Sequence, residues 1–312
     1  MSQYFLGVDG GQSSTTAVIG DEQGRIVAWA TAGPCNHVSA GEARAKFLKV
    51  MGECVAQAAT RAGMEGARPR FRAACMGMSG GPEDKAGLLR ELVAADDLIV
   101  THDGQTALSG AMSGGPGMIV IAGTGSFAFG ESASGDTARA GGWGYVYGDE
   151  GSAFDIARQA VRAILREHEG WGAHTALTPA LLEATETREA NELVHRLYTP
   201  EWPRSRVATL AQVVDQIAES GDPVAIDLMN VAAQQLALLA AAVRRQLFRE
   251  NEPSKLAWIG GVFGSDMLLS RFRMLIELEG SVTAGPPAHA PAVGALMLAY
   301  RAAGLRVSVQ QT

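Results

Sequence analysis

Short apolar runs alternate with longer amphipathic stretches along the chain, which is typical of a protein that mixes strands with helices. In the first part, the pattern predicts strands over 4–9, 15–20, 25–31, 71–78 and 98–101, and helices over 41–63, 83–94 and 103–113. The sequence Asp-Glu-Gln-Gly at 21–24 lies between two of these strands and indicates a hairpin turn. The glycine- and proline-rich stretch 114–117 then interrupts the pattern, so we place a domain boundary there.

The second part repeats the theme of a strand, a glycine-rich turn and another strand. It predicts strands over 118–122, 126–131 and 255–259, and helices over 151–168, 222–250, 265–272 and 290–303, with two or three more within 178–219. This weak duplication predicts an α/β protein of two domains with mixed sheets and a cleft between them. We expect the last helix to pack back on the first domain. The domains are then 1–114 with 290–312, and 115–289 with a helical insertion.

Composition narrows the class of protein. The 312 residues suffice for two domains with full cores, and 47% hydrophobic with 19% charged residues is typical of a soluble globular chain. No run approaches 18 apolar residues and no cleavable leader opens the chain, so neither a membrane span nor secretion is expected. The net charge of −7 without a basic cluster argues against nucleic acid. Cys35, Cys54 and Cys75 lack a metal-binding spacing and predict reduced thiols in a cytoplasmic protein.

Glycine-rich turns follow three of the predicted strands. Glycine lets the backbone approach an anion, and successive N–H groups can then point at it. The phosphate-binding candidates are Gly10, Gly11, Gln12, Ser13, Ser14 and Thr15 in the first turn, and Gly123, Thr124, Gly125 and Ser126 in the second. Each turn alone could be a plain hairpin, but the pair predicts a nucleotide whose phosphates lie between two domains. Gly260 and Gly261 follow a third strand, where an adenine ring could lie against the backbone.

Two aspartates stand at predicted strand ends. Asp9 precedes the first turn, where a carboxylate could orient a metal-bound water beside a transferred phosphate, or could simply cap the turn. Asp103 leads from a strand into a helix. It is a candidate general base that takes a proton from an attacking hydroxyl, and the alternative is a helix N-cap. We assign no role to the neighbouring His102.

A glycine- and aromatic-rich segment over 141–153 predicts a carbohydrate site. An aromatic ring can pack on the C–H face of a sugar while carboxylates bind its hydroxyls, which singles out Trp143, Asp149 and Glu150. The alternative is that one of the two carboxylates caps the following helix. Asn36 and His37 follow Gly33-Pro34, and by composition alone they form a loop.

These motifs together resemble the ATPase superfamily of actin, hexokinase and the heat-shock chaperones. Within it, the chain is similar to the branch of N-acetylglucosamine kinase and the BadF/BadG/BcrA/BcrD-type ATPases, on the strength of Asn36-His37, the Gly-Gly-Trp-Gly sequence at 141–144 and the Gly-Asp-Glu-Gly-Ser-Ala sequence at 148–153. The resemblance covers most of the chain and is weakest across 170–222. It implies two ribonuclease H-like, actin-like ATPase domains.

The resemblance also implies roles for particular residues. Asp103 would be the base for the 6-hydroxyl of an amino sugar, and Asp9 would assist Mg²⁺. The first two turns would hold ATP phosphates, and Gly260 and Gly261 would lie near adenine. The substrate-binding set would be Asn36, His37, Ser79, Gly80, Gly142, Trp143, Asp149 and Glu150. Two residues depart from relatives: Gln12 stands where glycine is usual, and Ala140 stands where the mammalian kinase has cysteine.

Three readings of function follow. The first is an ATP- and Mg²⁺-dependent amino-sugar kinase acting on N-acetylglucosamine, or alternatively on glucosamine or a related sugar. The second is a dehydratase-activator ATPase, whose iron–sulfur cluster needs thiolates that this chain lacks after Cys75. The third is a sugar sensor without phosphoryl transfer. The oligomeric state cannot be read from the sequence, although relatives are often dimers.

Overall fold

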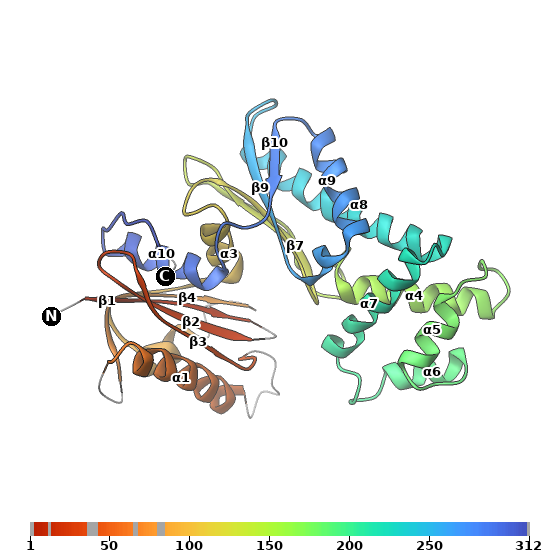
Figure 1. Cartoon of the computed structure of the whole chain (residues 1–312), viewed down its shortest axis with the longest axis horizontal. Helices are drawn as coiled ribbons and strands as arrows, with labels where there is room; N and C mark the ends of the chain where they lie inside the picture. The colour runs from red at the N-terminus through yellow and green to blue at the C-terminus, as the bar shows by residue number, and fades with distance from the viewer. Residues whose placement is uncertain (1–2, 12–13, 36–42, 65–67, 80–84, 311–312) are drawn as a thin grey trace. The chain divides into compact units, whose positions relative to one another are not determined.

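The computed structural model describes residues 3–11, 14–35, 43–64, 68–79 and 85–310. The chain forms two compact units, shown in Figure 1. Unit 1 consists of residues 1–116 and 287–312, and unit 2 of residues 117–286. The chain therefore leaves unit 1 once and returns to it once.

A five-stranded mixed sheet forms the centre of unit 1. Its strands are β1 (Tyr4–Gly10), β2 (Thr15–Asp21), β3 (Ile26–Ala32), β4 (Arg70–Met78) and β5 (Ala94–His102), in the order β3-β2-β1-β4-β5. The first three strands pair antiparallel, as the hairpin turn at 21–24 predicts. β4 and β5 add in parallel, so the carboxyl ends of β1, β4 and β5 meet at one edge of the sheet.

Helices cover both faces of this sheet, because successive side chains of a strand point to opposite faces (Figure 1). Leu6 and Val8 of β1 pack with α1 (Ala43–Arg61) on one face. Phe5 packs with α10 (Pro291–Ala302) on the other, its ring centroid 4.6 Å from that of Tyr300. A Cβ at Gly7 would lie 2.2 Å from the backbone nitrogen of Leu296, so glycine is what allows α10 to touch β1. The shorter α2 (Ala86–Leu92) and α3 (Asp103–Ala111) complete the unit.

Unit 2 repeats the same sheet topology. Its strands are β6 (Gly117–Ala122), β7 (Ser126–Glu131), β8 (Thr137–Gly141), β9 (Ser254–Ile259) and β10 (Val282–Gly285), in the order β10-β9-β6-β7-β8. β6 and β7 are antiparallel, as are β7 and β8, while β9 and β10 add in parallel. The predicted α/β fold with two mixed sheets is confirmed. The sequence pattern missed β8 and β10, which are short edge strands rich in alanine and glycine.

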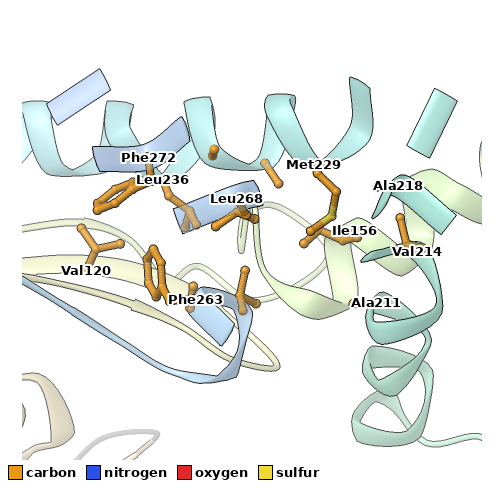
Figure 2. Packing of buried hydrophobic residues seen from close by; sticks show 14 of the residues in the cluster. Val120, Ile156, Ala211, Val214, Ala218, Met229, Leu236, Phe263, Leu268 and Phe272 are labelled. Atoms are coloured by element: carbon orange, nitrogen blue, oxygen red, sulfur yellow. The ribbon is translucent and has the colours of Figure 1, made fainter. Parts of the chain in front are cut away.

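The helices of unit 2 are α4 (Ala153–His168), α5 (Leu177–Ala184), α6 (Ala190–Leu197), α7 (Arg204–Glu219), α8 (Pro223–Leu247), the short 3-10 helix η1 (Gly261–Gly264) and α9 (Asp266–Leu278). Of these, α8 and α9 pack on the sheet, and the other α-helices pack on α8 and on one another. Figure 2 shows their core, in which Val120 of β6 lies in one cluster with Leu236 of α8 and Phe272 of α9. α4 and α7 extend this core away from the sheet.

One helix of unit 2, α8, is long and apolar enough to cross a membrane, although no such stretch was expected from the sequence. Its side chains Met229, Ala233 and Leu236 are buried against the sheet and neighbouring helices. One side of α8 therefore belongs to the core of unit 2.

Candidate active site

Three strand ends bring polar side chains together at the carboxyl edge of the unit 1 sheet. Gly10 of β1 pairs in register with Met78 of β4, which pairs with His102 of β5. The residues next to these ends, Asp9, Ser79 and Asp103, therefore share one edge, and the Ser79 N–H donates to the Gly10 carbonyl at 3.1 Å. This edge of a sheet is where α/β proteins commonly bind ligands.

The Asp103 carboxylate is fixed by two hydrogen bonds. The Ser79 hydroxyl donates to Oδ2 at 2.7 Å, and the Gly104 N–H donates to Oδ1 at 2.9 Å. The N-cap of α3 is His102, whose Nδ1 accepts the Gln105 N–H at 3.2 Å. His102, and not Asp103, is therefore the N-cap of α3, and the half-buried carboxylate of Asp103 is not used for capping.

Asp9 carries the strongest electrostatic perturbation of the site. Burial, and secondly the negative charge of Asp103, raise the pKa of Asp9 to about 7. Two carboxylates this close favour a bound cation, which would offset both effects. Among the described residues no three acidic, histidine or cysteine side chains form a metal cluster. Mg²⁺ commonly binds through one or two carboxylates plus substrate phosphates, so Asp9 fits that kind of site.

We expect the raised pKa of Asp9 to make Asp9→Asn more stable than the wild type above pH 7. Between about pH 4 and 7 the folded protein holds a proton that the unfolded chain has lost, so wild-type stability falls as the pH rises through this window. The variant cannot ionise there. Its advantage should reach up to about 4 kcal/mol, at about 1.4 kcal/mol for each pKa unit, and shrink toward pH 4.

Urea unfolding at pH 5 and pH 8 without metal measures this difference. Asp227→Asn is the matched control, because Asp227 is exposed on α8 and has the same chemistry. A pH-independent effect of Asp9→Asn would show that its carboxyl titrates normally.

Some polar groups of the first glycine turn form hydrogen bonds within the protein. The Gly11 N–H donates to the Ser14 carbonyl at 2.9 Å, which closes the turn. Thr15 is buried, and its hydroxyl donates to the Gly33 carbonyl at 2.9 Å. A Cβ at Gly10 would lie 2.8 Å from the Met78 sulfur, so a larger residue there would push the Met78 side chain aside. Among the described residues of this turn, Ser14 is exposed, so its hydroxyl is open to solvent.

Lys85 is a cation near this edge that the sequence reasoning missed. Its Nζ donates to the Ser79 carbonyl, and its charge reaches the Cys35 thiol. A lysine that precedes a short helix carries no motif, so only the folding of the chain identifies it. Lys85 therefore binds the carbonyl of Ser79, and the hydroxyl of the same serine binds Asp103.

Unit 2 places its two glycine turns side by side. Ile121 of β6 pairs with Ile259 of β9, so the Gly123 and Gly260 turns follow neighbouring parallel strands. Gly260 has φ 112°, and a Cβ there would lie 2.3 Å from the Ala122 carbonyl oxygen, so packing requires it. Gly123 and Gly261 differ, because a Cβ at either would meet no atom within 4 Å. Their missing side chains leave open space, which suits a ligand lying against the backbone.

An ion pair between the buried Asp149 and the half-buried Arg204 braces the turn over 123–126. Asp149 is 4% exposed, accepts the Ser126 N–H on Oδ1 at 3.3 Å, and pairs through Oδ2 with Arg204. Arg204 also donates to the Thr124 carbonyl at 3.1 Å. A Cβ at Gly125 would lie 2.9 Å from both partners of the pair. Arg204 opens α7, 80 residues from Thr124, and no local signal in the sequence pointed to it.

The remaining predicted sugar residues lie around the start of α4. Ser152 is the N-cap of α4 and accepts the Asp155 N–H at 3.2 Å, so neither Asp149 nor Glu150 caps that helix. Glu150 is half-buried, and its carbonyl accepts the Ser126 hydroxyl at 2.6 Å. Trp143 is 80% exposed and follows Gly142, which has φ 75°.

Five predicted site residues lie outside the described residues. They are Gln12, Ser13, Asn36, His37 and Gly80. Their roles stay as predictions from the sequence.

The fold and the carboxylate-bearing strand edge define an actin-like ATPase or sugar-kinase type of α/β protein. The sequence profile of the BadF/BadG/BcrA/BcrD ATPase family matches residues 6–299. The chain belongs to this family.

Individual relatives match over most of their length. The chain is 30% identical over 283 residues to the N-acetylmuramic acid/N-acetylglucosamine kinase of Clostridium acetobutylicum, covering 89% of this chain and 91% of that protein. It is 28% identical over 275 residues to the N-acetyl-D-glucosamine kinase of Dictyostelium discoideum, covering 83% and 85%. A solved structure from Chromobacterium violaceum, described as a candidate N-acetylglucosamine kinase, matches with a TM-score of 0.78 and 28% identity over 95% of this chain and 98% of that one.

Proposed function

We propose that this protein is an ATP-dependent kinase that phosphorylates the 6-hydroxyl of an amino sugar, with N-acetylglucosamine as the first candidate. The observation that carries the proposal is the fixed carboxylate of Asp103 at the sheet edge beside Asp9. Relatives that act on N-acetylglucosamine and N-acetylmuramic acid support the choice of an amino sugar.

In the proposed reaction, the sugar oxygen forms a bond to the γ-phosphorus while the bond from that phosphorus to the β–γ bridging oxygen breaks. The proton of the hydroxyl passes to the Asp103 carboxylate, and ADP leaves with the electrons of the broken bond. Ser79 and the Gly104 N–H orient the carboxylate toward one geometry. General-base assistance of this kind contributes about 10²–10⁴-fold to rate.

Other residues would bind the nucleotide and its metal ion. When bound, Mg²⁺ would neutralise charge on the ATP phosphates, and Asp9 is the residue that would hold it. We assign the open backbone at Gly123 and Gly261 to contacts with ATP, because nothing in the protein's own packing fills the space beside them.

The activator alternative is disfavoured by the cysteines. Cys35, Cys54 and Cys75 are all buried in unit 1. Burial raises the pKa of all three thiols, to about 11 for Cys54 and about 12 for Cys75. Cluster ligation needs accessible thiolates, which these thiols do not supply.

Coupled ADP-release assays across a panel of sugars test the proposal. The panel holds N-acetylglucosamine, glucosamine, N-acetylmannosamine, N-acetylmuramic acid and glucose. We expect ADP release that depends on an amino sugar and on Mg²⁺, with the phosphate on O6 by NMR. Sugar binding without ADP release would favour the sensor, and phosphate on another oxygen would overturn the assignment of the 6-hydroxyl.

A further inference from the structure

Unit 1 contains a cavity that none of the site residues line. Its volume is about 670 Å³, within the range of small-molecule pockets. Its walls come from the end of α3, from α10 and from the chain that follows α10. Asp9, Ser79 and Asp103 are absent from its lining, so it is separate from the candidate active site of this unit.

The lining of this cavity is cationic. It includes Arg301, Arg306 and His289, and it includes no aspartate or glutamate. Arg301 donates to the Gly114 carbonyl, which anchors one end of its guanidinium and leaves other donors available. Within the described part of the chain, the Arg306 side chain makes no hydrogen bond or ion pair. Arg301 and Arg306 are exposed at the cavity wall, and two guanidinium groups in a lining without carboxylates favour an anion.

The rest of the lining mixes apolar side chains with Ser113 and Ser308, and hydrogen bonds hold the segment that carries most of it. Met297, Leu305 and Val307 supply an apolar wall. Tyr300 donates its hydroxyl to the Asp21 carbonyl at 2.7 Å, and the Leu305 N–H donates to the Tyr300 carbonyl at 2.9 Å. Further along, the Gln310 N–H donates to the Gly24 carbonyl at 3.0 Å, so the segment that forms the wall is fixed at both ends.

The cavity also touches both places where the chain crosses between the units. Ser113 and Gly114 precede the exit after residue 116, and His289 follows the return at residue 287. The His289 N–H donates to the Gly110 carbonyl at 3.1 Å, which ties the returning segment to the end of α3. A ligand held by Arg301 and His289 would therefore bridge the two crossing segments.

We propose that this cavity binds a small phosphate monoester. Guanidinium groups bind phosphate oxygens through paired, charge-assisted hydrogen bonds, and the apolar wall accommodates the carbon part of an ester. The volume exceeds what inorganic phosphate alone would fill. The proposal does not depend on the kinase activity, because it concerns binding at residues outside the candidate active site.

Isothermal titration with glycerol 3-phosphate tests the site in the full-length protein. Saturating N-acetylglucosamine and a nonhydrolysable ATP analogue with Mg²⁺ are present, so that sites for those ligands are filled. Glycerol, glycerate and inorganic phosphate are the comparison ligands. They separate the contributions of the carbon chain, of a carboxylate and of phosphate alone.

We expect saturable 1:1 binding of glycerol 3-phosphate, weaker binding of glycerate and inorganic phosphate, and none of glycerol. Arg306→Ala should weaken binding by about tenfold or more, since a hydrogen bond between charged groups is lost. Arg245→Ala, which removes an exposed arginine of α8, should bind as the wild type does. Absence of saturable binding, or equal affinity in Arg306→Ala and the wild type, would overturn the proposal.

Discussion

Asp103→Asn should lower kcat by about 10²–10⁴-fold while the protein stays folded. The amide keeps the size of the carboxylate and can still accept the Gly104 N–H and meet the Ser79 hydroxyl, so the edge of the sheet should keep its geometry. What it loses is the ability to take the proton of the attacking hydroxyl. Single-turnover kinetics with the preferred sugar, together with thermal unfolding, measure both properties.

Ser79→Ala is the informative companion to this variant. It removes one hydrogen bond to the carboxylate and keeps the base, so we expect a smaller loss in kcat than in Asp103→Asn. Asp227→Asn controls for the change of an exposed carboxylate elsewhere. A near-normal kcat in Asp103→Asn would contradict the assignment of Asp103 as the base. The proposed kinase activity would still stand, since ADP release by the wild type is measured independently.

Arg204→Ala should destabilise unit 2 by up to about 3–5 kcal/mol. The change leaves the Asp149 carboxylate, which is 4% exposed, without its charged partner. It also removes the hydrogen bond to the Thr124 carbonyl and the packing of the guanidinium over Tyr145 and Phe154, at 5.2 and 5.6 Å from the ring centroids. Urea unfolding measures the loss.

The same variant should raise the KM for ATP more than the KM for sugar, because the ion pair braces the turn over 123–126. The double variant Arg204→Met with Asp149→Asn tests the cause: removing both charges should recover much of the stability lost in Arg204→Ala. Arg245→Ala is the matched control for loss of an exposed arginine. If Arg204→Ala unfolds at the wild-type urea concentration, the pair does not hold the turn.

The hydrophobic periodicity of the sequence was sufficient to predict most of the strands and helices. Strands such as β1 and β6 are continuous apolar runs that end at glycine, and these local signals do not depend on distant residues. β8 and β10 escaped notice because short edge strands of small residues have little hydrophobic pattern. The sequence of α8 does not say which of its apolar residues are buried, and the structure buries Met229, Ala233 and Leu236.

The sequence alone determined the family, the duplicated order of strands and glycine turns, and the carboxylates at the strand ends, because each is a local pattern of residue types. The tertiary structure decided how those residues are used. It makes His102 the N-cap of α3 and places Lys85 beside Ser79 at the sheet edge of unit 1. In unit 2 it pairs Asp149 with Arg204 at the turn over 123–126. Hydrogen bonds and ion pairs between residues distant in the chain depend on packing, and a single sequence carries no local signal for them.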